Sequence, residues 1–165
     1  MQIAFQDGEV AFGVVGQVVL CFWRAPFTRA RLRALRQLTL ETSRQHGRAA
    51  TLGVFDSQAI NLSAISDAEL RADATALARD AVERGDGPLC TVIEGDGFGV
   101  AAIRAAATTI RMAMPKNSNT RFSRDVISAV GELASVLGLE ADTRAKLLAG
   151  VNQLRACTQP QAPSS

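Results

Sequence analysis

Apolar and polar positions fall into blocks that predict strands followed by helices. Two short apolar runs come first, at 10–15 and 18–23. The pair Gly16-Gln17 between them puts glycine at the first central position of a tight turn, which is typical of a β-hairpin. We therefore predict that the chain opens with two antiparallel strands and that the second of them is buried.

Helix signals follow the hairpin. Thr28 is a favourable cap residue and Gly47 a favourable stop, so a helix is predicted between them, to about His46. A third strand is expected at 49–55. The capping box Ser66-Asp67-Ala68-Glu69 predicts the start of a second helix, which ends before the breaker at 85–88.

The strand-then-helix pattern then repeats. The remaining predicted elements are a strand at 89–94, a helix at 98–114, a short strand at 120–122, a helix capped by Ser123 and ended by Gly138, and a last helix at 141–157. This order predicts an α/β fold: a four- to five-stranded mixed sheet, largely parallel in its later part, with helices mainly on one face. Residues 1–138 would form the α/β domain, 139–157 a C-terminal helical extension that packs against it or completes an interface, and 158–165 a disordered tail.

Composition narrows the class of protein. The chain has 165 residues, 47% of them apolar, and a net charge of +2, which suits one domain with a substantial core. It contains neither an apolar run of spanning length nor a secretory signal, so a cytoplasmic protein without membrane insertion is expected. The arginine-rich first helix lacks interleaved aromatic residues and is interpreted as a solvated face rather than a nucleic-acid surface.

Signals for catalysis and for metals are weak. His46 is the single histidine, and three widely spaced cysteines without a C-x-x-C motif predict neither a disulfide framework nor a zinc site. Carboxylates near strand ends or helix starts could hold Mg²⁺, although acidic helix starts are expected from the helix dipole alone. These carboxylates are Asp56, Asp67, Glu94 and Asp96. No catalytic residue, metal or cofactor is predicted.

Two segments are candidates for binding. The turn containing Gly95, Asp96, Gly97 and Gly99 has backbone N–H groups where phosphate loops occur, but Val100 breaks the dinucleotide fingerprint. We interpret this segment as a flexible turn, and anion binding is the alternative. The helix at 98–114 carries only two charges and is apolar or small nearly all round, so it needs cover on both sides, from the last helix or from a second copy of the chain. Its candidate interface residues are Ala101, Ala102, Ala105, Thr109 and Met112.

Residues 51 to about 134 resemble the STAS family (sulphate transporter and anti-sigma-factor antagonist domains). A strand at 51–56 ends in Asp56 and leads to the serine-bearing helix start Ser63-Ala64-Ile65-Ser66-Asp67; the strand at 89–94 precedes a helix with Arg104; and Arg121-Phe122-Ser123 precedes a closing helix. The order of elements, including the opening hairpin, is also similar.

The resemblance implies docking onto a partner protein through the loop 57–66 and the helix start that follows it. Ser66 aligns best with the serine that the family phosphorylates, but Asp67-Ala68 follows it where the family has Ser-Gly, and a capping role for Ser66 is favoured. The candidate contact or phosphorylation residues are Ser57, Ser63, Ser66 and Asp67. The expected function is a non-catalytic regulatory protein–protein interaction module that forms a homodimer; the alternative is a domain that binds a nucleotide or apolar metabolite at the 95–99 turn.

Overall fold

The computed structural model describes residues 1–59, 68–95 and 119–158. One six-stranded sheet carries its strands in chain order: β1 (Gln2–Gln6), β2 (Val10–Val15), β3 (Val18–Trp23), β4 (Ala50–Asp56), β5 (Leu89–Glu94) and β6 (Thr120–Ser123). The helices are α1 (Arg29–His46), α2 (Ala68–Glu83), α4 (Val126–Leu137) and α5 (Ala141–Cys157), with a 3₁₀ turn η1 (Ser57–Ala59) after β4. The general α/β class predicted from the sequence is confirmed.

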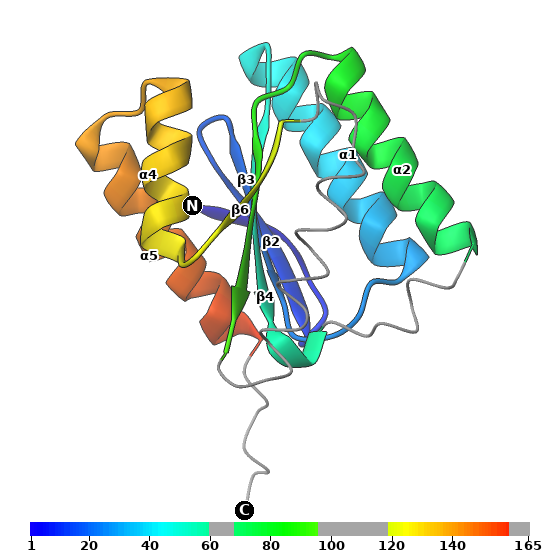
Figure 1. Cartoon of the computed structure of the whole chain (residues 1–165). Coiled ribbons are helices and arrows are strands. Elements are labelled where there is room, and N and C mark those ends of the chain that lie inside the picture. The colour runs from blue at the N-terminus through cyan, green and yellow to red at the C-terminus, as the bar shows by residue number, and fades with distance from the viewer. Residues whose placement is uncertain (60–67, 96–118, 159–165) are drawn as a thin grey trace, which may run out of the picture.

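The sheet is mixed in the way that the pattern predicts. Strands β1, β2 and β3 pair antiparallel, and β3 to β6 pair parallel. Right-handed crossovers that step across a sheet in one direction leave their helices on one face. Accordingly α1, which joins β3 to β4, and α2, which joins β4 to β5, lie side by side on the same face (Figure 1).

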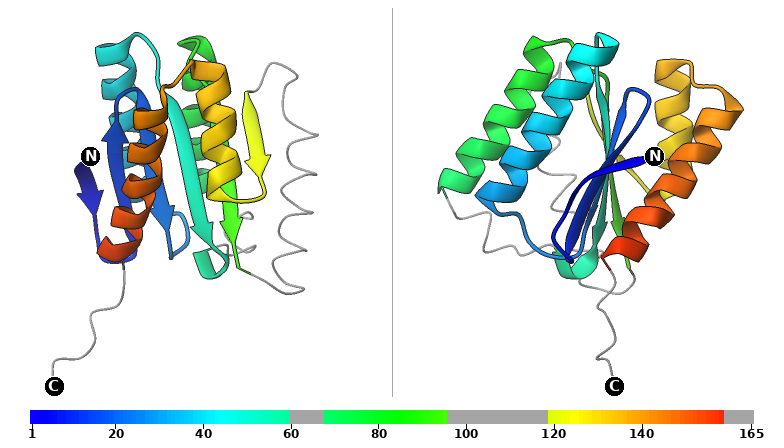
Figure 2. Two further views of the ribbon diagram at one scale, coloured as in Figure 1. Left: turned by 90° about the vertical axis from the view of Figure 1, so that its left-hand side faces the viewer. Right: turned by 180° about the vertical axis from the view of Figure 1, so that it is seen from behind.

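The described helices cover both faces of the sheet, whereas the sequence predicts helices mainly on one face. Figure 1 shows α4 and α5 on the face opposite α1 and α2, and Figure 2 shows the same three layers from two further directions. The physical reason lies in β3, all six residues of which are buried. Side chains alternate between the faces of a strand, so a strand buried at every position needs cover on both sides.

The sheet also has one more strand than expected, because β1 was missed. Its five residues alternate between exposed and half-buried and begin and end with glutamine, a weak apolar signal. It forms the edge of the sheet and pairs with β2, with an irregularity between Ile3 and Phe5. An edge strand needs little apolar surface, which explains why the hydrophobic pattern does not reveal it.

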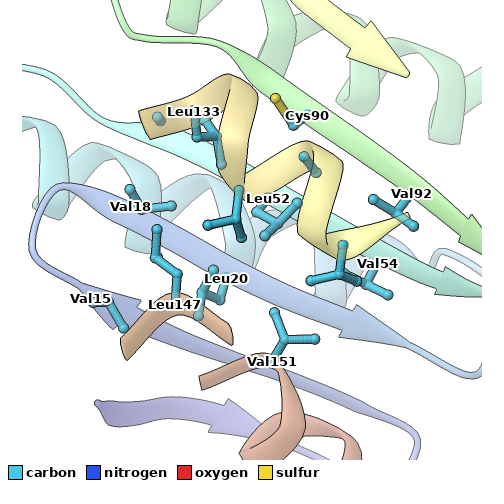
Figure 3. Close-up of a cluster of buried hydrophobic side chains, with 14 of the residues drawn as sticks. Val15, Val18, Leu20, Leu52, Val54, Cys90, Val92, Leu133, Leu147 and Val151 are labelled. Atoms are coloured by element: carbon cyan, nitrogen blue, oxygen red, sulfur yellow. The ribbon is translucent and has the colours of Figure 1, made fainter. Parts of the chain in front are cut away.

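Two apolar cores hold the layers together. On the α4 and α5 face, Leu20 and Leu52 of the sheet meet Leu133, Leu147 and Val151 (Figure 3). On the α1 face, Phe12, Trp23 and Cys21 meet Leu32 and Leu35. The last helix therefore packs against the domain, one of the two outcomes expected for it.

Most predicted helix boundaries are confirmed. The Thr28 hydroxyl caps α1, and both Gly47 and Gly138 take the left-handed conformation at helix ends. The cap of α4 is a correction: Asp125, not Ser123, accepts from the backbone N–H of Ser128 at 2.7 Å. Ser123 instead ends β6, and its hydroxyl donates to Glu132 at 3.1 Å. The predicted helix at 98–114, with Arg104, and residues 159–165 lie outside the described residues.

Candidate functional site

The ends of the parallel strands bring together the polar and aromatic groups that best fit a binding surface. In Figure 1 this is the lower end of the sheet, where η1 follows β4 and where α5 ends. We call it the strand-end rim and define it by Arg24, Phe27, Asp56, Ser57, Glu94 and Arg155. In open α/β sheets this carboxyl edge is where ligands and partners usually bind.

Charged side chains on the rim pair with one another. Arg24 Nε lies 3.8 Å from Asp56 Oδ2, and Arg24 Nη1 donates to the carbonyl oxygen of Thr158 at 2.9 Å. Asp56 and Glu94 occupy paired positions on β4 and β5. The side chains of Arg24, Asp56 and Glu94 each keep about a third of their surface exposed, and so does that of Arg155, the partner of Glu94.

Arg155 joins α5 to the sheet at this edge. Its guanidinium forms an ion pair with Glu94, donates to Asn152 at 2.6 Å and lies over the Phe22 ring, 5.9 Å from the centroid. Thr158, which the sequence assigns to the tail, is buried and its hydroxyl donates to the carbonyl oxygen of Arg155. The end of α5 is thus part of the rim.

An aromatic cluster lies at the same end of the strands, on the α1 side of the sheet. Trp23, the last residue of β3, contacts Phe27 at 4.7 Å and Phe55 at 5.8 Å between ring centroids, and Phe27 contacts Phe55 at 5.5 Å. Trp23 is fully buried, whereas Phe27 leaves 38% of its surface exposed. The buried rings hold the exposed one in place, so Phe27 presents a preorganised apolar surface at this end of the sheet.

Two buried thiols lie further inside. Burial raises the pKa of Cys21 to about 12, an effect that the neighbouring Trp23 indole partly opposes. Burial also raises the pKa of Cys90 to about 11, with the Glu132 carboxylate adding to the rise. Thiols that stay protonated are poor nucleophiles, so neither arrangement suits cysteine chemistry.

Several predicted site residues can now be placed. Ser57 opens η1 on the rim, and Gly95 follows β5 with a φ of 113°, a conformation that favours glycine. Asp56 and Glu94 come together as expected for strand ends, but each faces an arginine. Within the described ranges no group of three or more His, Cys, Asp or Glu side chains could hold a metal ion.

The other candidates lie outside the described residues. They are Ser63, Ser66 and Asp67; Asp96, Gly97 and Gly99; and Ala101, Ala102, Ala105, Thr109 and Met112. Sequence reasoning missed Phe27, Arg24 and Arg155. The first two follow a buried strand directly, which is a usable signal, whereas Arg155 is 61 residues from Glu94 and nothing local links them.

Comparisons with known proteins add no relative. No protein-family model, curated protein or solved structure matches the chain. None of the helices in the described part is long and apolar enough to cross a membrane.

Proposed function

We propose that the chain is a non-catalytic, cytoplasmic regulatory module that docks a partner protein through the strand-end rim. The observation that carries this proposal is Phe27, an exposed aromatic ring fixed against Trp23 and Phe55. Rigid aromatic anchors are among the usual hot spots of protein interfaces. The loop that the STAS resemblance assigns to docking begins at this same edge, with Ser57.

The charges suit the outer part of such an interface. Arg24, Asp56, Glu94 and Arg155 are ion-paired, partly exposed and of both signs. Pairs of this kind add little affinity but select among partners and affect the rate of association. A partner that reaches both sides of the strand ends, with an apolar pocket for Phe27 and charges of both signs on the α5 side, would fit the rim.

A comparison of matched variants tests the proposal. Phe27→Ala removes the exposed ring, and Val82→Ala removes an apolar side chain of similar exposure, 47%, from α2. Tagged wild-type and variant proteins would be used to capture partners from the source cells, and a captured protein would then be purified and titrated against all three. A partner that binds wild type and Val82→Ala at least about thirty-fold more tightly than Phe27→Ala supports rim docking. Equal affinity for all three proteins contradicts it.

A small-ligand function is the second candidate, and one observation favours it. The Nε1 atom of Trp23 is buried and, apart from the neighbouring Cys21 thiol, has no hydrogen-bond partner among the described residues. A thiol is a weak acceptor and buried polar groups normally have a better one, which an acceptor on a bound ligand would supply. A thermal-shift screen of nucleotides and apolar metabolites tests this candidate, because a ligand at 100 times its Kd stabilises the fold by about 2.7 kcal/mol.

A further inference from the structure

The side chain of Met1 occupies a slot between the sheet and α5. A Cβ built on Gly13 of β2 would lie 2.9 Å from Met1 Sδ, and a Cβ built on Gly150 of α5 would also lie 2.9 Å from it. Real Cβ atoms essentially never approach so closely, so the thioether fills space that is free because both positions are glycine. Both views of Figure 2 show the N-terminal end of the chain beside α5.

The two glycines stand where glycine is unfavourable. Gly13 lies within β2, between Ala11 and Val15, which both belong to the core on the α5 side, and Gly150 lies within α5. Glycine inside a strand or a helix weakens the element and usually marks the close approach of another group. At Gly150 the approaching groups are Leu20 and the Met1 sulfur, and at Gly13 the same sulfur approaches. The methionine therefore fastens α5 to β2.

This methionine is also open to solvent. Met1 leaves 40% of its surface exposed, although its sulfur lies against the two glycines. An accessible thioether is readily oxidised to the sulfoxide. The thiols of Cys21 and Cys90 differ in both respects, because they are buried and their pKa values are raised to about 12 and 11, so they stay protonated.

We propose that Met1 is an oxidation site at which a hydroperoxide loosens α5 from the sheet. The sulfur takes one oxygen atom from the oxidant: an S–O bond forms as the O–O bond of the peroxide breaks. Sulfur loses two electrons, and the remainder of the peroxide leaves as water or, from an alkyl hydroperoxide, as an alcohol. The product is a sulfoxide, which is polar and larger than the thioether by one oxygen.

A sulfoxide does not suit the slot. Its oxygen needs water or a hydrogen-bond donor, and burial without one is costly. The side chains nearest to the slot at Gly150, those of Leu20 and Val15, are apolar. The oxidised side chain is therefore expected to turn towards water, which leaves the two glycines uncovered and α5 less tightly packed on β2. This inference does not use the rim and is independent of the proposed docking function.

Hydrogen exchange of the full chain before and after treatment with hydrogen peroxide tests the proposal. The background variant carries Met112→Leu, Met114→Leu and Cys157→Ser, so Met1 is its only methionine and the partly exposed thiol is gone. Mass spectrometry should place one added oxygen on Met1, at no less than about a tenth of the rate of free methionine. Backbone amides of α5 should then exchange at least about five-fold faster, whereas those of α1, on the opposite face, should not change.

Met1→Leu in the same background, released from a cleavable N-terminal fusion, is the matched control. Leucine is apolar, of similar size and inert to peroxide, so exchange in α5 should not respond to the oxidant. In wild type, reduction of the sulfoxide by methionine sulfoxide reductases, confirmed by mass, should restore the original exchange. The proposal is overturned if Met1 stays reduced or if its oxidation leaves exchange in α5 unchanged. It is also overturned if Met1→Leu responds like its parent, or if fast exchange persists after the sulfoxide has been reduced.

Discussion

Arg31 and Asp7 are 24 residues apart and form a short, oriented ion pair: Arg31 Nε donates to Asp7 Oδ2 at 2.7 Å. Arg31 also donates to Glu9 at 2.7 Å and to the Pro26 carbonyl at 3.0 Å. It is one of the few buried charged residues in the described chain. This contact fastens the start of α1 to the turn between β1 and β2, and so positions the loop that carries Phe27.

The Arg31–Asp7 pair predicts an acid-labile element of stability. Burial alone would raise the pKa of Asp7, but hydrogen bonds from Arg31 and from the backbone N–H groups of Glu9 and Val10 hold it below its ordinary value of 3.8. A carboxyl whose folded-state pKa is lowered stabilises the fold above its unfolded pKa, and this stability is lost as the pH falls through the folded pKa. Denaturant titrations should show a decline below about pH 4.

Asp7→Asn is the matched variant for this prediction. It keeps the size of the side chain but cannot ionise, so it should lower stability at pH 7 by about 1–3 kcal/mol and lose less on acidification than wild type. Glu41→Gln on α1 is the control, since its partner Gln37 is uncharged. Equal pH dependence of wild type and Asp7→Asn would contradict the assignment.

The three cysteines should differ sharply in reactivity. Cys21 and Cys90 are buried with pKa values raised to about 12 and 11, whereas Cys157 is partly exposed. Thiolates react and thiols do not, so at pH 8 one fast-reacting thiol is expected in the native protein and three after unfolding. Cys157→Ser should abolish the fast phase of reaction with a chromogenic disulfide. A second fast thiol in the native protein would show that one core opens readily.

The sequence predicted elements well where local chemistry decides them. The unbroken apolar run of β3, the Thr28 cap and the Gly47 stop each act over a few residues, and each is confirmed. The edge strand β1 was missed because its stability comes from pairing with β2 and not from its own composition. The cap of α4 was misassigned by two residues, since Ser123 and Asp125 are both good caps and the geometry of β6 decides between them.

The rim was predictable only in part. The topology of parallel strands places Asp56 beside Glu94, and this follows from the strand order alone. Their arginine partners depend on how loops and α5 pack. Gly150 is a sequence signal for the packing of α5, because an isolated glycine inside a helix usually marks a close approach to a neighbouring element. The sequence alone does not identify which strand α5 approaches. The structure shows that the approach is to Leu20 of β3.

Helix α5 is expected to be indispensable for folding rather than an extension of an independent domain. Leu147, Val151 and Leu154 are buried against β2 and β3, in the same core as Leu20 and Leu52. A chain ending at Gly138 would expose this face of the sheet, and far-UV circular dichroism should show it unfolded or aggregated. Leu147→Ala in the full chain should cost about 2–5 kcal/mol by denaturant titration. A cooperative, monomeric 1–138 fragment would contradict this view of α5.

Two helical glycines offer an internal comparison of helix propensity with packing. Alanine is preferred to glycine inside helices by about 1 kcal/mol. Gly131 of α4 has open space where a Cβ would lie, so Gly131→Ala should stabilise the fold by about 0.5–1 kcal/mol.

At Gly150 of α5 the new Cβ would lie 2.7 Å from Leu20 Cδ1 and 2.9 Å from Met1 Sδ. Overpacking of that kind costs about 1–3 kcal/mol, so Gly150→Ala should be neutral or destabilising despite the same gain in propensity. Urea titrations of wild type and both variants measure these changes in stability. Equal stabilisation by the two substitutions would show that α5 lies further from β3 than the structure places it.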